Sequence, residues 1–426
     1  MRFNFALLVL VALACDSRLT AAEKPNVLFV LADDQRFDTI AALGNGEIKT
    51  PNLDKLVARG FTFGNAYCQG SMVPAVCTPS RTMILTGRSL FRIPNPQAKT
   101  YDGPALPTAF AAGGYTTLHV GKPGNSFRAA HQKFDKVVEI AHQNAPTAKK
   151  CADAVIDFVK AHDGKKPFFV YLAPSVPHDP RVAPAEFHKL YDPAKLTLSK
   201  NFMPRHPFDN GELAIRDEKL AALPRTQDEM RKHLADYYAC ITNLDGELGR
   251  VLDALRDAKQ LDNTLVVFTS DQGLAVGGRH GLMGKQNLYE HFKSPLVVAG
   301  PGVPKGKSEA LVYLFDLFPT VCDLTGTATP KGVEGESLAP IMGKKATGRA
   351  HLFAAYRDVQ RMVRDERYKL MWYPKIEKFQ LFDLRADPDE LKDLSEDKAH
   401  AKPLADLRAA MAREQKLWGD TAPILK

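Results

Sequence analysis

The sequence predicts an α/β fold with a large, mostly parallel sheet flanked by helices, followed by a small antiparallel sheet and a last helix. Two features of the 426 residues predict this fold. Short apolar runs alternate with amphipathic segments along most of the chain, which is typical of parallel strands joined by helices. After Gly326, short apolar runs follow one another with only brief polar gaps, which is typical of hairpins. The content of 45% hydrophobic and 25% charged residues is that of a globular protein.

The strands expected in the large sheet are apolar runs, and the expected helices are amphipathic segments. Residues 27–32 are continuously apolar, as in a strand buried on both faces. Gly60 ends one expected helix, and Gly113 with Gly114 ends another. In chain order we expect a strand at 27–32, helices at 53–59 and 106–112, a strand at 116–120, a helix at 152–162, a strand at 168–173, a long helix at 227–258, strands at 265–269 and 295–299, and a helix at 314–324.

The change of pattern divides the chain into a large α/β domain at 23–340 and a small C-terminal subdomain at 341–426. Within the large domain, the stretch from Ala185 to Arg225 is rich in proline and polar residues. We expect this stretch to lie on the surface near the mouth of the functional site. In the small subdomain we expect strands at 351–356, 360–364, 368–373 and 380–384 and a helix at 402–418.

Residues 1–22 have the pattern of a signal peptide. Arg2 is followed by an apolar stretch at 3–14 and by small residues at 20–22. The alternative is a strand or helix of the core. We expect export, to a periplasm or out of the cell. Cys15 leaves lipoprotein anchoring as a less favoured alternative.

Charge and hydropathy limit the partners. Removal of residues 1–22 takes away Arg2, Arg18 and Asp16, so the formal net charge falls from +8 to +7. This excess suits an anionic substrate or surface. The positive residues are scattered, so we expect no nucleic acid as a partner. No segment is long enough for a transmembrane span.

The sequence contains six cysteines, without a CxxC pair or a zinc-like spacing. Export permits disulfides, but the spacing of the cysteines identifies no bridge. Disulfides and buried free thiols therefore remain equal alternatives.

Polar side chains follow four of the expected strands where each strand ends. Asp33-Asp34, Lys122, His178 and Asp271-Gln272 each come after an apolar run. In open α/β sheets, ligands bind at the carboxyl ends of the strands. The four positions together predict one shared cleft.

The oxygen atoms of this set predict a divalent cation. Asp33 and Asp34 are adjacent carboxylates that repel each other by roughly 4 kcal/mol at close range and intermediate dielectric. Asp271 adds a carboxylate and Gln272 an amide oxygen. Calcium tolerates such irregular oxygen coordination, whereas magnesium requires a tight octahedron. A turn or helix cap is the alternative for Asp33-Asp34 taken alone.

The stretch Cys77-Thr78-Pro79-Ser80-Arg81 combines a cysteine, a proline and an arginine at fixed spacing. Together with Thr86-Gly87-Arg88, it resembles the site at which type I sulfatases, members of the alkaline phosphatase superfamily, convert cysteine to formylglycine. The resemblance extends from Pro25 to about Trp418 and implies an alkaline-phosphatase-like fold. A buried structural cysteine is the alternative for position 77.

The resemblance implies a mechanism and two cofactors. Cys77 would become formylglycine through a formylglycine-generating or anaerobic sulfatase-maturating enzyme. One calcium ion would be held by position 77 together with Asp33, Asp34, Asp271 and Gln272. The hydrated aldehyde would attack the sulfate sulfur, the alcohol would leave, and the second hydroxyl would expel sulfate. The implied activity is that of a sulfuric ester hydrolase of the EC 3.1.6 type.

Further residues match the family by position. Arg81 corresponds to the arginine that holds the formylglycine hydrate, and Lys122 to a lysine that contacts the sulfate. His178 resembles the histidine near the leaving-group oxygen. Lys285 matches the lysine that binds sulfate and protonates the leaving alcohol, and His280 is expected to line the same pocket. Taken singly, each lysine has the alternative of a solvated surface charge.

The chain departs from the family at two places. Gln272 stands where sulfatases more often have asparagine or histidine. The run after Lys122, Pro123-Gly124-Asn125-Ser126, lacks the histidine that acts on the formylglycine. The base that drives sulfate release is therefore open, with His119, His131 and His142 as candidates.

Three functions remain on these residues. The favoured one is calcium- and formylglycine-dependent removal of sulfate from an extracellular sulfated carbohydrate, since 177–180 and 281–290 are most similar to carbohydrate and iduronate-type sulfatases. The alternatives are a phosphate or phosphonate ester hydrolase of the same superfamily and a non-catalytic binder of sulfated glycans.

Overall fold

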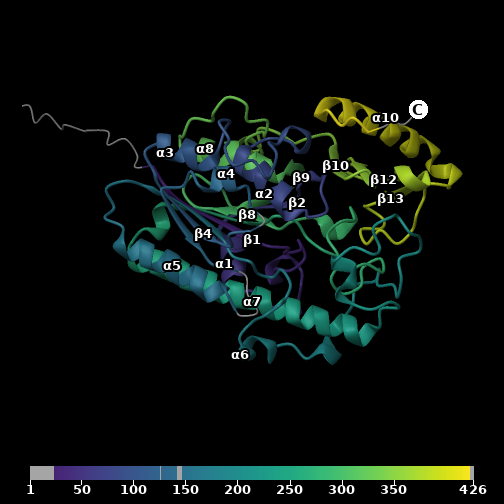
Figure 1. The fold of residues 1–426 in the computed structure, drawn as a ribbon, viewed down its shortest axis with the longest axis horizontal. Coiled ribbons are helices and arrows are strands. Elements are labelled where there is room, and N and C mark those ends of the chain that lie inside the picture. Colours follow the sequence, from purple (N-terminus) through teal and green to yellow (C-terminus); the bar gives the residue numbers. More distant parts are fainter. Residues whose placement is uncertain (1–23, 125, 142–145, 423–426) are drawn as a thin grey trace, which may run out of the picture.

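The computed structural model describes residues 24–422 except 125 and 142–145. The signal peptide expected at 1–22, with Cys15, lies outside the described residues. Figure 1 shows a large sheet covered by helices on both faces and a second, smaller sheet with the C-terminal helix beside it. The predicted α/β class, with its small antiparallel sheet and final helix, is confirmed. The described residues include no helix with both the length and the apolar character needed to span a bilayer.

The large sheet has eight strands in the order β5-β4-β6-β1-β7-β8-β2-β9. Only β8 runs against its neighbours, β7 and β2, so the sheet is mostly parallel. The central strand β1 pairs with β6 and β7 on its two sides, and Ala32 lies opposite Ser270 at the end of β7. The strands are β1 (Asn26–Ala32), β2 (Phe61–Tyr67), β4 (Thr116–Gly121), β5 (Lys136–Glu139), β6 (Phe168–Ala173), β7 (Thr264–Ser270), β8 (Leu296–Ala299) and β9 (Gly306–Tyr313).

Both faces of this sheet are buried because its side chains alternate between two layers of helices. Leu28 and Val30 of β1 pack with the α1, α5 and α7 side, whereas Val27 and Phe29 pack with the α2, α3, α4 and α8 side. Figure 1 shows α5 and α7 on one side of the sheet and α2, α3 and α8 on the other. The helices are α1 (Pro51–Arg59), α2 (Cys77–Thr86), α3 (Leu106–Ala112), α4 (Arg128–His131), α5 (Ala148–Ala161), α6 (Ala185–His188), α7 (Gln227–Asp257), α8 (Leu317–Leu324) and α9 (Ala339–Met342).

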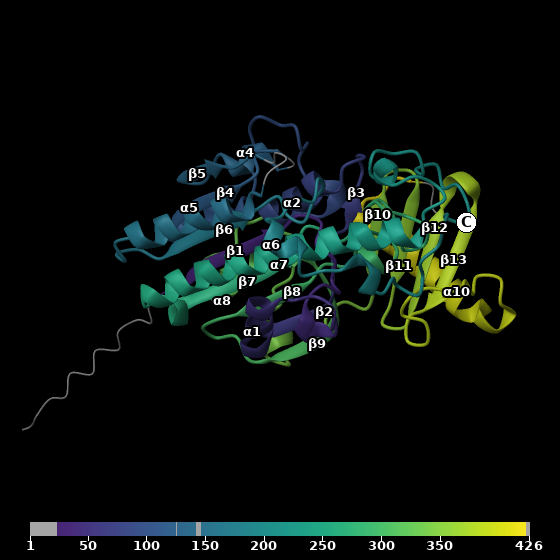
Figure 2. The same ribbon diagram turned by 90° about the horizontal axis from the view of Figure 1, so that it is seen from below.

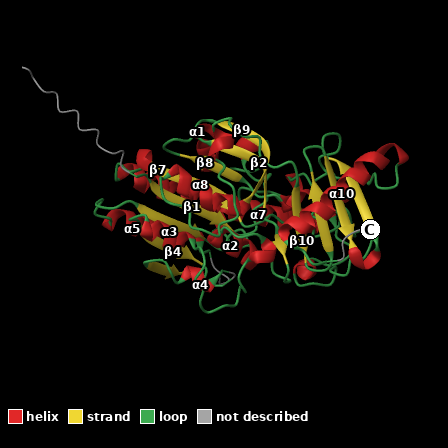
Figure 3. Ribbon diagram, turned by 90° about the horizontal axis from the view of Figure 1, so that it is seen from above, coloured by secondary structure: helices red, strands yellow, loops and turns green. Residues whose placement is uncertain are grey.

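The small sheet has five strands in the order β13-β12-β11-β10-β3. The pairs from β10 to β13 are antiparallel, and the short β3 joins β10 in parallel although it comes from the N-terminal part of the chain. Figures 2 and 3 show this sheet lying beside the large one, with α10 packed against it. Its elements are β3 (Gly70–Ser71), β10 (Leu352–Tyr356), β11 (Gln360–Arg364), β12 (Tyr368–Tyr373), β13 (Lys378–Asp383) and α10 (Ala401–Trp418).

One apolar core is continuous between the two sheets, since it includes Phe29 and Val267 of the large sheet and Leu370 and Leu381 of the small one. The small sheet is therefore packed onto the large unit rather than tethered to it. The boundary at 340/341 stays a prediction.

Three strands of the large sheet, and the two-residue β3 of the small sheet, were missing from the sequence-based expectation. β5 is a short edge strand with the exposed sequence Lys-Val-Val-Glu, and β9 begins with exposed polar residues. β2 contains Gly64 and Asn65 within its apolar run. Edge strands carry polar residues because one side of them faces solvent, and such strands lack the apolar run that predicts a buried strand.

Candidate active site

The polar residues after four parallel strands converge. Asp33 and Asp34 follow β1, Asp271 and Gln272 follow the adjacent β7, Lys122 follows β4, and His178 lies beyond β6. The backbone joins these strand ends, since Asp33 N–H donates to the Val176 carbonyl oxygen at 3.0 Å and Asp271 N–H donates to that of Ala32 at 3.2 Å. The sheet therefore places these side chains together at the carboxyl ends of its strands, which is where ligands bind in open α/β sheets.

Asp34 is held in a left-handed backbone conformation with φ of 72°. Its N–H donates to Asp271 Oδ1 at 3.0 Å, and its carbonyl oxygen accepts from the Tyr237 hydroxyl at 2.6 Å. The same hydroxyl accepts the Arg36 N–H at 2.7 Å. Such backbone is uncommon outside glycine and persists where the surroundings fix it. Tyr237 on α7 thus helps to fix the turn, although no sequence signal singles it out.

Cys77 is the first residue of α2 and is fully buried. Its Sγ lies 3.5 Å from Asp34 Oδ1 and accepts from Gln272 Nε2 and from Lys285 Nζ, each at 3.2 Å. Burial, and then the charge of Asp34, raise the pKa of the Cys77 thiol well above its usual value. The position that carries the predicted modification is thus at the centre of the polar cluster.

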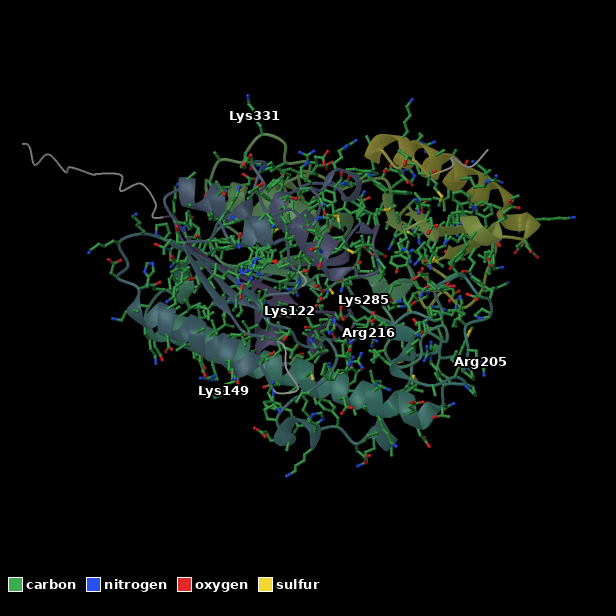
Figure 4. All side chains as sticks on the ribbon, viewed as in Figure 1. Lys122, Lys149, Arg205, Arg216, Lys285 and Lys331 are labelled. Atoms are coloured by element: carbon green, nitrogen blue, oxygen red, sulfur yellow. The ribbon has the colours of Figure 1, made fainter. Side chains whose placement is uncertain are left out.

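Three cations pair with the three carboxylates around Cys77. Arg81 Nε donates to Asp271 Oδ2 at 2.9 Å, and its Nη2 lies 3.3 Å from Asp33 Oδ1. Lys285 Nζ donates to both carboxylate oxygens of Asp34 at 2.9 and 3.0 Å. Lys122 donates to Asp33. Figure 4 shows Lys122 and Lys285 in the middle of the molecule, away from the outlying Lys149 and Lys331.

The pairing affects the carboxylates unequally. Burial disfavours the charge of Asp33, but Lys122 and Arg81 outweigh it and hold the pKa of Asp33 well below its usual range. Asp271 is buried too and is repelled by Asp33, so its pKa rises to about 6 despite Arg81. The cluster therefore holds more carboxylate than its own cations fully stabilise.

His178 borders the same cluster. Its Nδ1 donates to the Asp179 carbonyl oxygen at 2.6 Å, and its Nε2 lies 3.8 Å from Asp34 Oδ2. The side chain is 11% exposed, so it forms part of the boundary between the buried charges and solvent. The structure brings His178 together with the carboxylates and Cys77, as the sequence predicted.

Two acceptor oxygens test whether this donor set fits a cation. Asp33 Oδ1 and Gln272 Oε1 are buried, and neither receives a hydrogen bond within the described residues. A buried acceptor without a donor costs about 1–3 kcal/mol. Ligand atoms of Asp33, Asp34, Cys77 and His178 all lie within 4.8 Å of one another. This group of ligand atoms, with the carboxylate of Asp271 hydrogen-bonded to the Asp34 N–H, fits a metal ion, and its carboxylate oxygens suit a hard cation such as Ca²⁺.

The segment expected near the mouth of the site does reach it. Arg216 Nη1 donates to Asp179 Oδ1 at 2.8 Å and to Asp217 Oδ1 at 2.9 Å. Gln286, next to Lys285, donates to Asp217 Oδ2 at 2.8 Å. This chain of contacts connects the loop after β6 with the loop that carries Lys285. Sequence reasoning located the segment but missed these residues, because no motif marks them.

His280 lies in a neighbouring cluster. Its Nε2 is 2.8 Å from Glu290 Oε2 and 3.0 Å from Asn201 Nδ2, and its ring stacks on Tyr289 with centroids 4.0 Å apart. None of the contacts found for His280 among the described residues is to the Cys77 cluster. Its predicted place in the substrate pocket stays a prediction.

The candidates for the missing base are buried behind Arg81. The rings of His119 and His131 stack with centroids 3.7 Å apart. Burial lowers the pKa of His119 well below its usual value and that of His131 to about 4. Both are therefore neutral near pH 7, and no contact with Cys77 is found for either. His142 and Asn125 lie outside the described residues.

Five cysteines fall within the described residues, and all five are free and buried: Cys68, Cys77, Cys151, Cys240 and Cys322. The sequence left disulfides and buried free thiols as alternatives. In the described part of the chain, the cysteines are buried free thiols.

Comparison with known families agrees with this site. The model of the sulfatase family matches residues 25–327, and that of the N-sulphoglucosamine sulphohydrolase C-terminal region matches residues 278–417. The two matches together span residues 25–417. The chain belongs to the sulfatase family and is a sulfatase.

Individual relatives cover nearly the whole chain. The N-acetylglucosamine-6-O-sulfatase of Bacteroides thetaiotaomicron is 25% identical over 94% of this chain and 88% of its own length. A structure solved in complex with its substrate D-glucosamine-2-N,6-O-disulfate superposes with a TM-score of 0.79 at 22% identity, over 95% of this chain and 100% of that one. The phosphonate monoester hydrolase of Silicibacter pomeroyi superposes with a TM-score of 0.76 at 24% identity, over 93% and 96%. At such identities the structures establish a shared fold.

Proposed function

We propose that this sulfatase is exported and hydrolyses sulfate esters of an extracellular carbohydrate, with a formylglycine derived from Cys77 and one calcium ion. The observation that carries the proposal is the position of Cys77. Its Sγ lies 3.2 Å from Lys285 Nζ and 3.5 Å from Asp34 Oδ1, at the point where side chains from four strand ends meet. A nucleophile placed there lies beside both a carboxylate oxygen and an ammonium group.

The residues that would hold calcium are Asp33, Asp34, Asp271 and Gln272, together with position 77. Bound calcium supplies positive charge that makes a hydroxyl more acidic and offsets the charge of a sulfate. Asp33 Oδ1 and Gln272 Oε1, both without a hydrogen-bond donor, support this assignment. Arg81 contacts Asp33 and Asp271 at once, and so fixes the spacing of two of the carboxylates.

The hydrate of formylglycine at position 77 would supply an oxygen nucleophile with a second hydroxyl group. A thiol has no such second hydroxyl group. The chain contributes the orientation of that residue. Position 77 begins α2, and Ser80 in the same turn donates to the Asp271 carbonyl oxygen at 2.6 Å. The start of the helix is thereby fixed to the end of β7, and the free amides of a first helical turn favour a negatively charged group.

The cations of the cluster would bind the sulfate group. Lys285 and Lys122 are buried, and their ammonium groups lie on carboxylates that a calcium ion would share. Three carboxylates and the charges of Arg81, Lys122 and Lys285 cancel, so a divalent ion leaves an excess of two positive charges. That excess matches a sulfate ester and one developing negative charge in the transition state.

Proton donors lie on the side of the leaving alcohol. Lys285 Nζ is within hydrogen-bonding distance of Cys77 Sγ and also contacts the Asp34 carboxylate. His178 Nε2 lies 3.8 Å from the same Asp34 carboxylate, and its side chain is 11% exposed. We assign protonation of the leaving alcohol to Lys285, with His178 orienting its oxygen. Sulfate bound at this centre would leave the alcohol pointing toward solvent.

Two observations support a carbohydrate as the alcohol. The relatives include an N-acetylglucosamine-6-O-sulfatase, and a protein of the same fold was solved with the substrate D-glucosamine-2-N,6-O-disulfate. The signal-like residues 1–22 support export of the enzyme. Sulfated polysaccharides occur outside the cell, so an exported enzyme would meet them. A formylglycine-generating or anaerobic sulfatase-maturating enzyme is the partner that this function requires.

The experiment combines modification with turnover. Protein produced together with a maturation enzyme is digested with trypsin, and the peptide that ends at Arg81 is weighed; we expect the mass of an aldehyde at position 77. Sulfate release from sulfated oligosaccharides should fall on the order of 10⁴-fold or more in Cys77→Ala, because the nucleophile is lost. Cys240→Ala, at a buried cysteine on α7, is the matched control and should keep its activity.

The outcome separates the alternatives. Faster release of phosphate than of sulfate from matched aryl esters would replace the proposal with a phosphoesterase. No release of either ion by protein that carries the aldehyde would leave a non-catalytic glycan binder.

A further inference from the structure

A surface cavity of about 550 Å³ lies beside the site, and no residue of the Cys77 cluster lines it. We name it the Lys99–Arg128 cavity after its two cations. Its described walls come from Thr78, from the loop at 96–99 and from Pro123, Gly124, Ser126, Arg128 and Gln132. Thr78 follows Cys77 in the chain and Pro123 follows Lys122, so two segments that build the catalytic cluster also border this cavity. Its volume lies in the usual range for small-ligand sites.

The described lining of the cavity contains cations and neutral polar groups but no carboxylate. Lys99 and Arg128 are both exposed, and within the described residues neither side chain makes an ion pair or a hydrogen bond. Gln97, Gln132 and Ser126 add amide and hydroxyl donors. Exposed cations elsewhere on this chain commonly have an acidic partner, as Lys149 has Asp153 and Arg250 has Glu247. A cavity with unpaired cations and no acid selects an anion.

We propose that the Lys99–Arg128 cavity binds a second oxyanion, a sulfate ester or carboxylate, on a sugar next to the one whose sulfate reacts. This inference rests on the proposed function, which places a carbohydrate sulfate at Cys77. A sugar chain held there reaches the cavity past Thr78 and Pro123. The guanidinium group of Arg128 and the ammonium group of Lys99 supply charge-assisted hydrogen bonds to the oxyanion. The enzyme thereby prefers a chain with several anionic groups over a single sulfated sugar.

The test measures binding, so that it does not depend on turnover. Sulfated maltotetraose, which carries only sulfates, and tetragalacturonate, which carries only carboxylates, are titrated calorimetrically into the mature protein at fixed ionic strength. In the double variant Lys99→Gln, Arg128→Gln, we expect Kd for at least one of them to rise about tenfold or more, because charged hydrogen bonds are lost. The oligosaccharide that is weakened identifies the oxyanion.

Two controls accompany the titration. Lys331→Gln removes an exposed lysine for which no ion pair is found among the described residues and which lies at the periphery in Figure 4. It should leave both Kd values unchanged, which separates a site from general surface charge. Inorganic sulfate cannot contact both sites at once, so its binding at the catalytic centre should be equal in the double variant and the parent. Thermal unfolding checks that both variants fold.

Either of two results would overturn the inference. One is a Kd for both oligosaccharides that is the same in the double variant as in Lys331→Gln; the other is no binding of either by the parent protein at millimolar concentration. Failure of the proposed function is seen separately, as absence of sulfate release from protein with the aldehyde at position 77. Loss of turnover with the Kd change intact would therefore refute the function and leave the anion site standing.

Discussion

The two sheets contribute to the site in different ways. The eight-stranded sheet positions the residues proposed to act on the substrate, since Asp33, Asp271 and Lys122 each follow the end of one of its parallel strands. Among the described residues, the five-stranded sheet supplies no side chain that contacts Cys77. It instead binds the loop that carries Lys285. The Gln360 side chain of β11 accepts the Leu288 N–H at 3.1 Å, and that of Gln380 on β13 accepts the Tyr289 hydroxyl at 2.6 Å.

The two sheets therefore contain residues with two different roles: those proposed to contact the cation or sulfate, and those that hold a loop in position. Residues that bind a cation or a sulfate must be of particular types, and their effect is on the reaction. Residues that fix a loop need only match it in shape and hydrogen bonding, and their effect is first on stability and then, through the loop, on rate. Substitutions of similar size in the two sheets should therefore change different measured quantities.

The largest contrast is expected between two buried lysines. Lys285→Met removes the ammonium group that lies on Asp34 and Cys77, and we expect kcat to fall roughly 10²–10³-fold, as for loss of one transition-state donor. Lys369→Met on β12 leaves Glu390, its partner at 2.6 Å, buried without a counter-charge. We expect the free energy of unfolding to fall by about 3–5 kcal/mol, with kcat per folded molecule nearly unchanged.

Sulfate release and calorimetric unfolding, both in saturating calcium, distinguish the two effects. If the folded fraction of Lys369→Met lost as much kcat as Lys285→Met, the small sheet would take part in the chemistry and the contrast would fail.

Acid should weaken the packing of the 185–225 segment against the loop that carries His280. Burial lowers the pKa of His206 to about 4, and its Nδ1 donates to the His280 carbonyl oxygen at 2.8 Å. Above pH 6.5 this histidine is neutral in the folded and the unfolded chain, so it contributes no pH dependence. Between pH 6.5 and 4 only the unfolded chain takes up the proton, so the free energy of unfolding falls by on the order of 3 kcal/mol as pH decreases.

Urea denaturation at several pH values measures this slope. His206→Asn, which keeps a donor for the His280 carbonyl oxygen, should have a shallower slope over the same interval. Equal slopes in the variant and the parent would show that the acid sensitivity comes from other groups, such as the buried His291, whose pKa burial lowers to about 3.

The sequence located the residues proposed to act on the substrate far better than the residues that hold the loops in position. Asp33, Lys122, His178 and Asp271 were found because parallel strands end at one edge, so polar residues after apolar runs must meet there. Cys77 was singled out because the proposed modification requires fixed neighbours along the chain. These signals are local in sequence, and the structure brings all of these residues together.

The positioning of the loops depends on contacts between distant residues. Gln360 is 72 positions from Leu288, and Tyr237 is 203 positions from Asp34. Neither side chain differs in type from many other buried polar residues, so no pattern along the chain marks it. The edge strands β5 and β9 were missed for a related reason, because half of their surface faces solvent and their sequences are mixed.

A smaller effect is expected where the small sheet contacts the loop directly. Gln360→Leu keeps the volume but leaves the buried Leu288 N–H without an acceptor and removes the bond to Asn287. We expect a loss of about 1–3 kcal/mol in the free energy of unfolding and, since Lys285 lies three residues away, a roughly tenfold fall in kcat.

Arg367→Ala, which removes an ion pair with Asp383 at the outer part of the same sheet, is the control. It should leave kcat unchanged. The interpretation of Gln360 as a positioning residue requires the loss of kcat to exceed any change in KM, and an effect on KM alone would contradict it.

The smallest effect is expected at the mouth of the site. Arg216 joins Asp179 and Asp217 and so connects the loop of His178 with that of Lys285, but its side chain is 58% exposed. Exposed ion pairs contribute only about 0–1 kcal/mol, so Arg216→Ala should lower kcat/KM by a few-fold and leave the unfolding temperature unchanged. Arg205→Ala, at an exposed arginine of the same segment for which no ion pair is found among the described residues, should change neither. Kinetics of both variants on one sulfated oligosaccharide measure the difference. A loss as large as that of Lys285→Met would mean that Arg216 contacts the substrate itself, and that the chemical groups of the site extend beyond the large sheet into the 185–225 segment.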